Sequence, residues 1–183
     1  MRNQIVAGNW KMNKTASETE SLLDELSAKL PDTHASVIVA PTFVNLSTAQ
    51  NSLQSSTIVV AAQNMHFAAN GAYTGEISAD MLLDIGVETV ILGHSERRSL
   101  FGEDDALLAQ KVKTALDKGM QIIFCFGEEL EERKSGNHFD IVKSQLQNAL
   151  LDLDADSWSK IVLAYEPDWA NDTGETASPD HAQ

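Results

Sequence analysis

The sequence predicts one α/β domain over residues 1–183, with about six parallel strands and helices outside them. Short runs rich in Val and Ile alternate with longer amphipathic stretches, the pattern of βα units in a parallel sheet. Most of the short runs are continuously apolar, as expected for strands that are covered on both faces. No low-complexity linker or stronger repeat interrupts this alternation, so we expect a single layered domain.

The strand candidates are the six apolar runs that begin the successive βα units. They cover residues 5–9, 36–40, 58–63, 89–92, 121–125 and 160–165.

The segment after the first strand predicts a helix that ends before Pro31. Ser17 followed by Glu20 is a capping-box pattern, which marks Ser17 as the candidate N-cap. Leucines recur every four residues from Leu22 to Leu30, and this spacing places them on one helix face. Pro31 cannot continue a helix, so the helix should stop there.

A second helix is expected between the fourth and fifth strands. Asp104 is a candidate N-cap, and Leu108, Val112 and Leu116 share one face. Gly119 supplies a residue suited to the left-handed conformation that often ends helices.

Three further segments are interpreted from their local pattern. Residues 138–151 predict a helix, and the charged stretch 128–134 before it is interpreted as a solvated surface. Ser178 followed by Pro179 is typical of a helix start.

Composition excludes several classes of protein. A formal net charge of −14 argues against nucleic-acid binding, which needs clustered Lys and Arg. No apolar run is long enough to cross a bilayer, and the N-terminus does not resemble a signal peptide. The single cysteine, Cys125, excludes an internal disulfide and is interpreted as a packed apolar residue rather than a nucleophile. We therefore expect a soluble cytoplasmic protein.

Polar residues follow several predicted strands, and these positions carry the chemistry in a βα barrel. Lys11 follows the first strand, His94 follows the fourth at the start of a short helix, and Glu166 follows the sixth. Each alone has an ordinary explanation as a loop residue. Together a cation, an imidazole and a carboxylate at one rim would supply an electrophile, an acid and a base.

Four segments resemble the signature segments of the triosephosphate isomerase family, and they occur in the family's order. The resemblance implies a TIM (β/α) barrel, here truncated after the sixth strand and its loop. The segments are AGNWKMN from Ala7, GAYTGEIS from Gly71, ILGHSERR from Ile91 and AYEP from Ala164.

The resemblance implies that dihydroxyacetone phosphate and glyceraldehyde 3-phosphate are interconverted, a step of glycolysis, without a cofactor or metal. By this resemblance Glu166 would be the base that moves the carbon proton, and His94 the neutral electrophile. The amides of Ser95 and Glu96 would disfavour the imidazolium form of His94. Lys11 would supply positive charge to the substrate.

The resemblance also implies Asn9 as a substrate-binding residue beside Lys11. The 71–78 segment resembles a loop that reaches into the partner subunit. Tyr73, Thr74 and Gly75 are therefore expected at a homodimer interface, with Thr74 near its centre.

The sequence departs from the family at the substrate phosphate. The family's last two βα units and their phosphate-binding amides have no counterpart here. In the loop after Glu166, Asp172 replaces a glycine whose amide contacts phosphate in the family, which leaves Asp172 a questionable substrate-binding residue. Two unit charges about 4 Å apart repel by about 4 kcal/mol at an effective dielectric near 20. Activity would be impaired accordingly.

Three interpretations of function follow. The first is an isomerase of phosphorylated trioses, with weakened turnover or turnover only after self-association. The second is an inactive, self-associating barrel fragment whose exposed edge strands pair with a second copy. The third is a binder of a neutral or cationic ligand in an acidic, half-open barrel mouth, because eight carboxylates and one lysine lie between Asp152 and Gln183.

Overall fold

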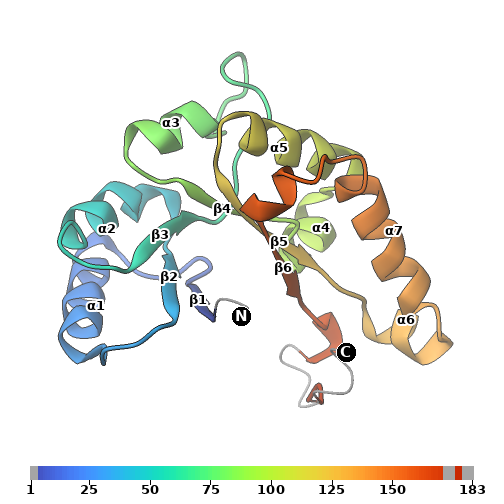
Figure 1. Ribbon diagram of the computed structural model, residues 1–183, viewed down its shortest axis with the longest axis horizontal. Helices are drawn as coiled ribbons and strands as arrows, with labels where there is room; N and C mark the ends of the chain where they lie inside the picture. The colour runs from blue at the N-terminus through green and yellow to red at the C-terminus, as the bar shows by residue number, and fades with distance from the viewer. Residues whose placement is uncertain (1–3, 171–175, 179–183) are drawn as a thin grey trace. The chain divides into compact units, whose positions relative to one another are not determined.

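The computed structural model describes residues 4–170 and 176–178. The strands follow one another in chain order from the first to the sixth, and the first–second, second–third, third–fourth and fifth–sixth pairs are parallel. Helices alternate with them along the chain (Figure 1). This confirms the predicted α/β class and the TIM-type βα topology. The described residues group into two compact units, Met1–Val90 with Lys118–Met120, and Ile91–Asp117 with Gln121–Gln183.

The first unit contains three βα repeats and the start of a fourth strand. The first strand, Ile5 to Asn9, pairs along its whole length with the second strand, Ser36 to Ala40. Gln4 O extends this pairing by accepting from Ser36 N. Its core includes the side chains of Leu23, Leu46 and Leu82, each at most 1% exposed. Its elements are β1 (Ile5–Asn9), α1 (Ala16–Lys29), β2 (Ser36–Ala40), η1 (Phe43–Asn45), α2 (Leu46–Ser52), β3 (Val59–Ala62), α3 (Ala79–Asp84) and the start of β4 (Thr89–Leu92).

The second unit holds the end of β4 and the rest of the chain. Helices α5 and α7 pack against each other and against β5. Phe124 in β5 and Leu108 in α5 are completely buried between these layers. Its further elements are α4 (Ser95–Phe101), α5 (Asp105–Asp117), β5 (Gln121–Phe126), α6 (Leu130–Ser135), α7 (His138–Leu150), η2 (Ser157–Lys160), β6 (Ile161–Tyr165) and η3 (Asp168–Ala170).

The predicted strands and long helices are present, with small changes at their ends. β1, β2 and β4 have the predicted bounds, and the other three strands differ by one residue at one end or both. The α5 prediction is confirmed in detail, because Asp104 Oδ1 accepts a hydrogen bond from Leu107 N at 2.8 Å and Gly119 has φ of 75°. The α7 prediction is also confirmed. Cys125 is buried, as expected of a packed apolar residue.

The start of α1 was assigned to the wrong residue. Thr15, not Ser17, is the N-cap, and Glu18 Oε2 accepts hydrogen bonds from Thr15 N at 2.8 Å and Thr15 Oγ1 at 2.9 Å. The buried apolar position is also different. Leu23 is 0% exposed, whereas the predicted stripe of Leu22, Leu26 and Leu30 is only half-buried.

The 128–134 stretch is not a solvated surface throughout. Residues Leu130–Ser135 form α6, and Glu128 just before it is 1% exposed. The helix predicted to begin at Ser178 would comprise residues 179–183, and these lie outside the described residues.

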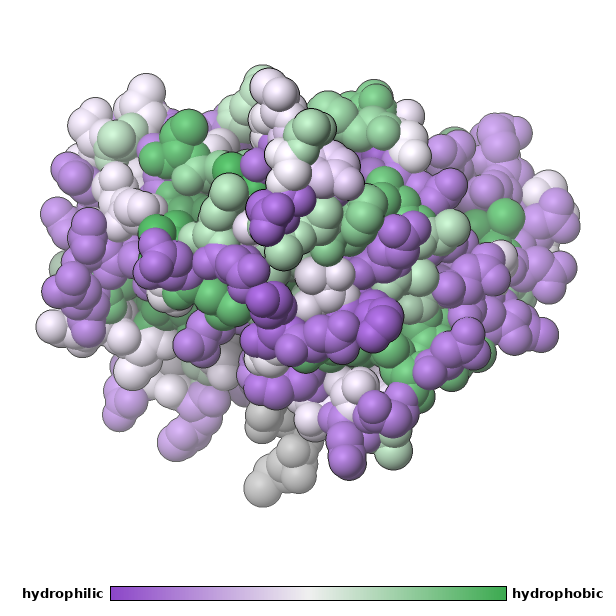
Figure 2. Space-filling model, turned by 90° about the horizontal axis from the view of Figure 1, so that it is seen from above, coloured by the Kyte–Doolittle hydropathy of each residue, from purple (hydrophilic) through white to green (hydrophobic). Residues whose placement is uncertain are grey.

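Apolar side chains also reach the surface. Figure 2 shows hydrophobic residues among hydrophilic ones on the face it presents. In the part of the chain that the structure describes, no helix is long and apolar enough to cross a membrane. The large apolar side chains that are more than half exposed are Val6, Met12, Val44, Met81, Leu100, Phe101, Phe139 and Leu151.

Candidate active site

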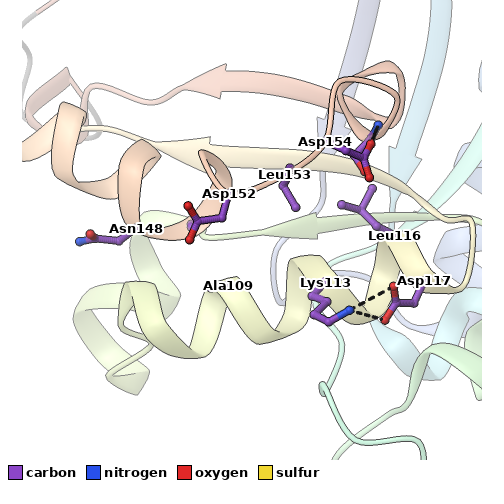
Figure 3. A pocket seen from close by; sticks show the side chains of 10 residues that line it. Ala109, Lys113, Leu116, Asp117, Asn148, Asp152, Leu153 and Asp154 are labelled. Carbon is purple, nitrogen blue, oxygen red and sulfur yellow. Dashed lines mark hydrogen bonds and ion pairs between the residues drawn. The ribbon is translucent and has the colours of Figure 1, made fainter.

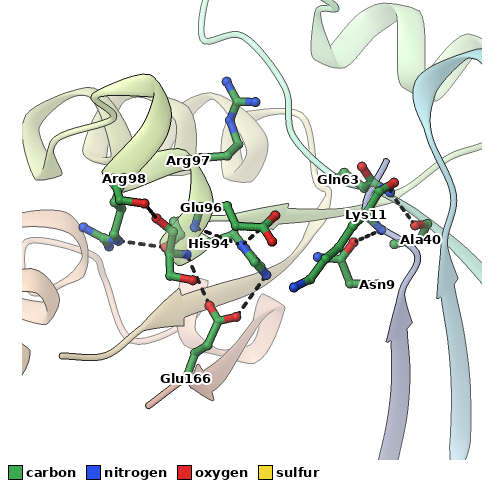
Figure 4. A network of polar contacts seen from close by, with 12 residues as sticks. Asn9, Lys11, Ala40, Gln63, His94, Glu96, Arg97, Arg98 and Glu166 are labelled. Atoms are coloured by element: carbon green, nitrogen blue, oxygen red, sulfur yellow. Dashed lines mark hydrogen bonds and ion pairs between the residues drawn. The ribbon is translucent and has the colours of Figure 1, made fainter. Parts of the chain in front are cut away.

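His94 and Glu166 face each other in the second unit, at the ends of β4 and β6. His94 Nε2 lies 3.0 Å from Glu166 Oε1, and Ser95 N donates to Glu166 Oε2 at 3.2 Å (Figure 4). The side chains are 10% and 21% exposed, respectively. Both oxygens of a partly accessible carboxylate are thus held by groups of the β4–α4 junction.

The hydrogen bonds of His94 indicate its tautomer. His94 is the N-cap of α4, and its Nδ1 accepts from Glu96 N at 3.3 Å. The proton then sits on Nε2, from which it is donated to Glu166 Oε1. A neutral imidazole with its N–H aimed at the base is able to polarise a carbonyl oxygen placed there. The Glu96 Oε2 atom lies 3.8 Å from the same Nδ1 atom.

The Glu166 carboxyl is kept ionised by its surroundings. Burial raises its pKa, but the hydrogen bonds from His94 and Ser95 outweigh burial and hold the pKa below its ordinary value of 4.5. At neutral pH Glu166 is therefore a carboxylate that can accept a proton.

The bend that carries His94 depends on Gly93 and Arg98. Gly93 has φ of 80°, and a Cβ atom there would lie 2.6 Å from the carbonyl oxygen of Cys125. Arg98 Nε donates to Gly93 O at 2.7 Å, and its Nη1 is paired with Asp105 Oδ1 at 2.7 Å. Arg98 thereby ties the peptide before His94 to the start of α5.

Lys11 and Asn9 lie in the first unit, at the end of β1. Lys11 has φ of 51°, an uncommon backbone conformation for a residue with a side chain. Asn9 Oδ1 accepts from Lys11 N at 3.0 Å, and Gln63 Nε2 donates to Lys11 O at 2.8 Å (Figure 4). The same Gln63 nitrogen donates to Ala40 O at 2.8 Å. These bonds hold an exposed lysine in a strained backbone, a feature that often accompanies function.

The predicted interface residues lie in a loop of the first unit. Tyr73 is 45% exposed, and its ring packs 4.2 Å from that of His66 between centroids. Thr74 and Gly75 are exposed, and Gly75 has φ of 95°. Asp172, the questionable substrate-binding residue, lies outside the described residues.

The interpretation of residues 128–134 as a solvated surface missed a buried carboxylate, Glu128. Glu128 accepts hydrogen bonds from Tyr165 Oη at 2.8 Å, Trp169 Nε1 at 2.9 Å and Arg133 Nη1 at 3.0 Å. Burial raises the pKa of Glu128, but these three donors lower it by more than burial raises it. The net pKa is therefore below its ordinary value. Glu128 thus ties together the residues on both sides of Glu166. Only its position after a strand could have marked it in the sequence.

Burial and then the Glu128 carboxylate raise the pKa of Tyr165 from 10.0 to about 12. This interaction stabilises the fold fully below pH 10 and is lost as pH rises towards 12. The chain has two tyrosines, so in a Tyr73→Phe variant the tyrosinate absorbance reports Tyr165 alone. We expect its midpoint near 12, and a lower midpoint when Glu128→Gln is added. A midpoint near 10 in both proteins would contradict the buried hydrogen bond.

A cavity of about 350 Å³ lies elsewhere in the second unit, between α5, α7 and the turn after α7 (Figure 3). Lys113 and Asp117 form an ion pair at its edge. None of the predicted site residues lines it, so it is not where the catalytic pair acts.

Comparisons with known proteins agree with the geometry. The family model described as triosephosphate isomerase matches residues 4–183. The triosephosphate isomerases of Flavobacterium johnsoniae and Flavobacterium psychrophilum are 65% and 60% identical to the chain, and that of Alkaliphilus oremlandii is 48% identical. Each alignment covers 100% of this chain and 74% of the relative.

Proposed function

Because the chain belongs to the triosephosphate isomerase family, we propose that it interconverts dihydroxyacetone phosphate and glyceraldehyde 3-phosphate. The observation that carries the proposal is the contact between a neutral His94 and an ionised Glu166. The family match and the identity to curated isomerases favour this enzyme over an inactive fragment. We propose that the activity belongs to glycolysis, as the family implies, and that the protein acts in the cytoplasm.

In the proposed mechanism Glu166 removes a proton from the carbon next to the substrate carbonyl. His94 Nε2–H stabilises the developing enediolate oxygen, which is the largest change of charge in the reaction. His94 Nε2 gives its proton to this oxygen and takes the hydroxyl proton from the neighbouring oxygen, so that the carbonyl and hydroxyl oxygens exchange roles. Glu166 then returns the carbon proton to the neighbouring carbon. Substrate must first displace the carboxylate from His94 Nε2 and Ser95 N, which hold it in the resting state.

We assign Lys11 and Asn9 a binding role. The ammonium of Lys11 supplies a positive charge for a phosphorylated substrate, and Asn9 fixes the Lys11 backbone through its side-chain oxygen. The strained φ of Lys11 supports this assignment, because such strain persists where the surroundings enforce it.

Turnover in heavy water tests the mechanism. A proton carried by a carboxylate exchanges with solvent, so purified protein should form product that carries deuterium at the reacting carbon. NMR detects both the product and the label. Absence of turnover would refute the isomerase function, and turnover without deuterium in the product would refute transfer through a base that exchanges its proton with solvent during the reaction.

We further propose that the chain self-associates as a homodimer through the loop containing Tyr73, Thr74 and Gly75. The exposure of these residues and of Met12 and Val44 supports this, since apolar side chains at a surface favour association. Sedimentation of the purified protein measures the state directly, and a monomer at all concentrations would refute the proposal.

A further inference from the structure

Gln145 in α7 clamps the peptide that follows β5. Its Oε1 accepts a hydrogen bond from Gly127 N at 3.0 Å, and its Nε2 donates to Gly127 O at 2.8 Å. One side-chain amide thus satisfies both backbone polar groups of a single residue. Because α7 packs against α5 and β5, Gln145 is anchored to the layer that supports the sheet.

Gly127 in turn lies directly against the backbone of the base. A Cβ atom added to Gly127 would lie 1.8 Å from Glu166 O and 2.7 Å from its carbonyl carbon. No residue with a side chain could approach so closely without displacing Glu166. The backbone N–H of Glu166 is also held, because Glu166 N donates to Phe126 O at 2.8 Å.

Gln145, Gly127 and Glu166 therefore form a chain of contacts from helix to base. The register of β5 and β6 pairs Phe126 with Tyr165, so Gly127 and Glu166 leave the two strands together. The paired residues of β5 and β6 end at Phe126 and Tyr165, and Glu166 N is held by Phe126 O. The Gln145 clamp holds the Gly127 peptide that follows.

We propose that Gln145 is a positioning residue that places the Glu166 carboxylate for proton transfer, acting through the Gly127 peptide. The inference rests on the proposed function of Glu166. Loss of the clamp lets Gly127 and the Glu166 backbone shift together. A displacement of about 1 Å at a catalytic group costs about 10²-fold in rate.

The test compares Gln145→Leu, which removes both hydrogen bonds, with Gln145→Glu, which at neutral pH keeps the acceptor for Gly127 N and loses the donor. We expect kcat to fall about 10- to 100-fold in Gln145→Leu with KM nearly unchanged, and to fall less in Gln145→Glu. The matched control is Gln147→Leu, an exposed glutamine on the same helix, which should retain the kcat of the unaltered protein.

A second measurement does not depend on turnover. NMR titration of the Glu166 carboxyl carbon should give a pKa closer to the ordinary value in Gln145→Leu, because contacts with His94 and Ser95 loosen. If the unaltered protein showed no turnover, the isomerase function would be refuted. The titration of Glu166 would still test whether Gln145 positions it. Equal kcat in Gln145→Leu and Gln147→Leu, or an unchanged Glu166 pKa in Gln145→Leu, would overturn the proposal.

Discussion

Replacing Glu166 by Gln is expected to lower kcat/KM for triose phosphate isomerisation by about 10²–10⁴-fold, the usual contribution of a positioned general base. Glutamine has nearly the same shape, and its oxygen is able to accept the hydrogen bond from Ser95 N that now reaches Oε2 at 3.2 Å. Its amide cannot accept the carbon proton. The loss should therefore appear in kcat, with a small change in KM.

Steady-state kinetics of both directions of the reaction would measure this loss. Glu131→Gln is a matched control, because the Glu131 side chain is 85% exposed in a surface ion pair with Lys134. It removes the same charge without touching the site. If Glu166→Gln retained the activity of Glu131→Gln, Glu166 would not be the base.

Local patterns sufficed for those parts of the fold that local contacts decide. The bounds of α5 follow from Asp104, whose side chain caps the helix, and from Gly119, whose positive φ ends it. β4 was predictable because its continuous apolar run is buried at every residue. β1 and β6 are apolar runs too, but their residues are exposed or half-buried.

The start of α1 was not predictable because two Ser/Thr-x-x-Glu patterns overlap. Thr15 with Glu18 and Ser17 with Glu20 fit the capping box equally well in sequence. The structure selects the first, where Asn45 Nδ2 donates to Lys14 O at 2.8 Å and fixes the chain just before Thr15. This contact joins residues far apart in the sequence.

The surroundings of Glu166 show the same limit. His94 and Glu166 could be assigned from strand-end motifs. Glu128 was misinterpreted because its donors Tyr165 and Trp169 lie about forty residues later, where no local pattern records the pairing. Gln145 belongs to no sequence motif. Only the folded structure brings the oxygen and the nitrogen of its side-chain amide to the same glycine.

Replacing Lys111 by Met is expected to lower the stability of the fold strongly, because it removes one of the cations that pair with the buried Glu103 carboxylate. Lys111 Nζ lies 2.6 Å from Glu103 Oε1, and both side chains are 3% exposed. Within the described residues, Glu103 Oε2 has no hydrogen-bond partner. Removing one partner of a buried pair costs about 3–5 kcal/mol. Arg97 Nε still contacts Glu103 Oε1 at 2.6 Å, so we expect the lower end of that range.

Urea denaturation would measure the change in the free energy of unfolding. Lys113→Met on the same helix is the control, because Lys113 is 73% exposed in an ion pair with Asp117 and should cost less than about 1 kcal/mol. Adding Glu103→Gln to Lys111→Met should recover part of the loss, since the double variant no longer buries a carboxylate that has lost one of its two cations. Equal losses in Lys111→Met and Lys113→Met would mean that the Lys111–Glu103 pair contributes no more than a surface ion pair.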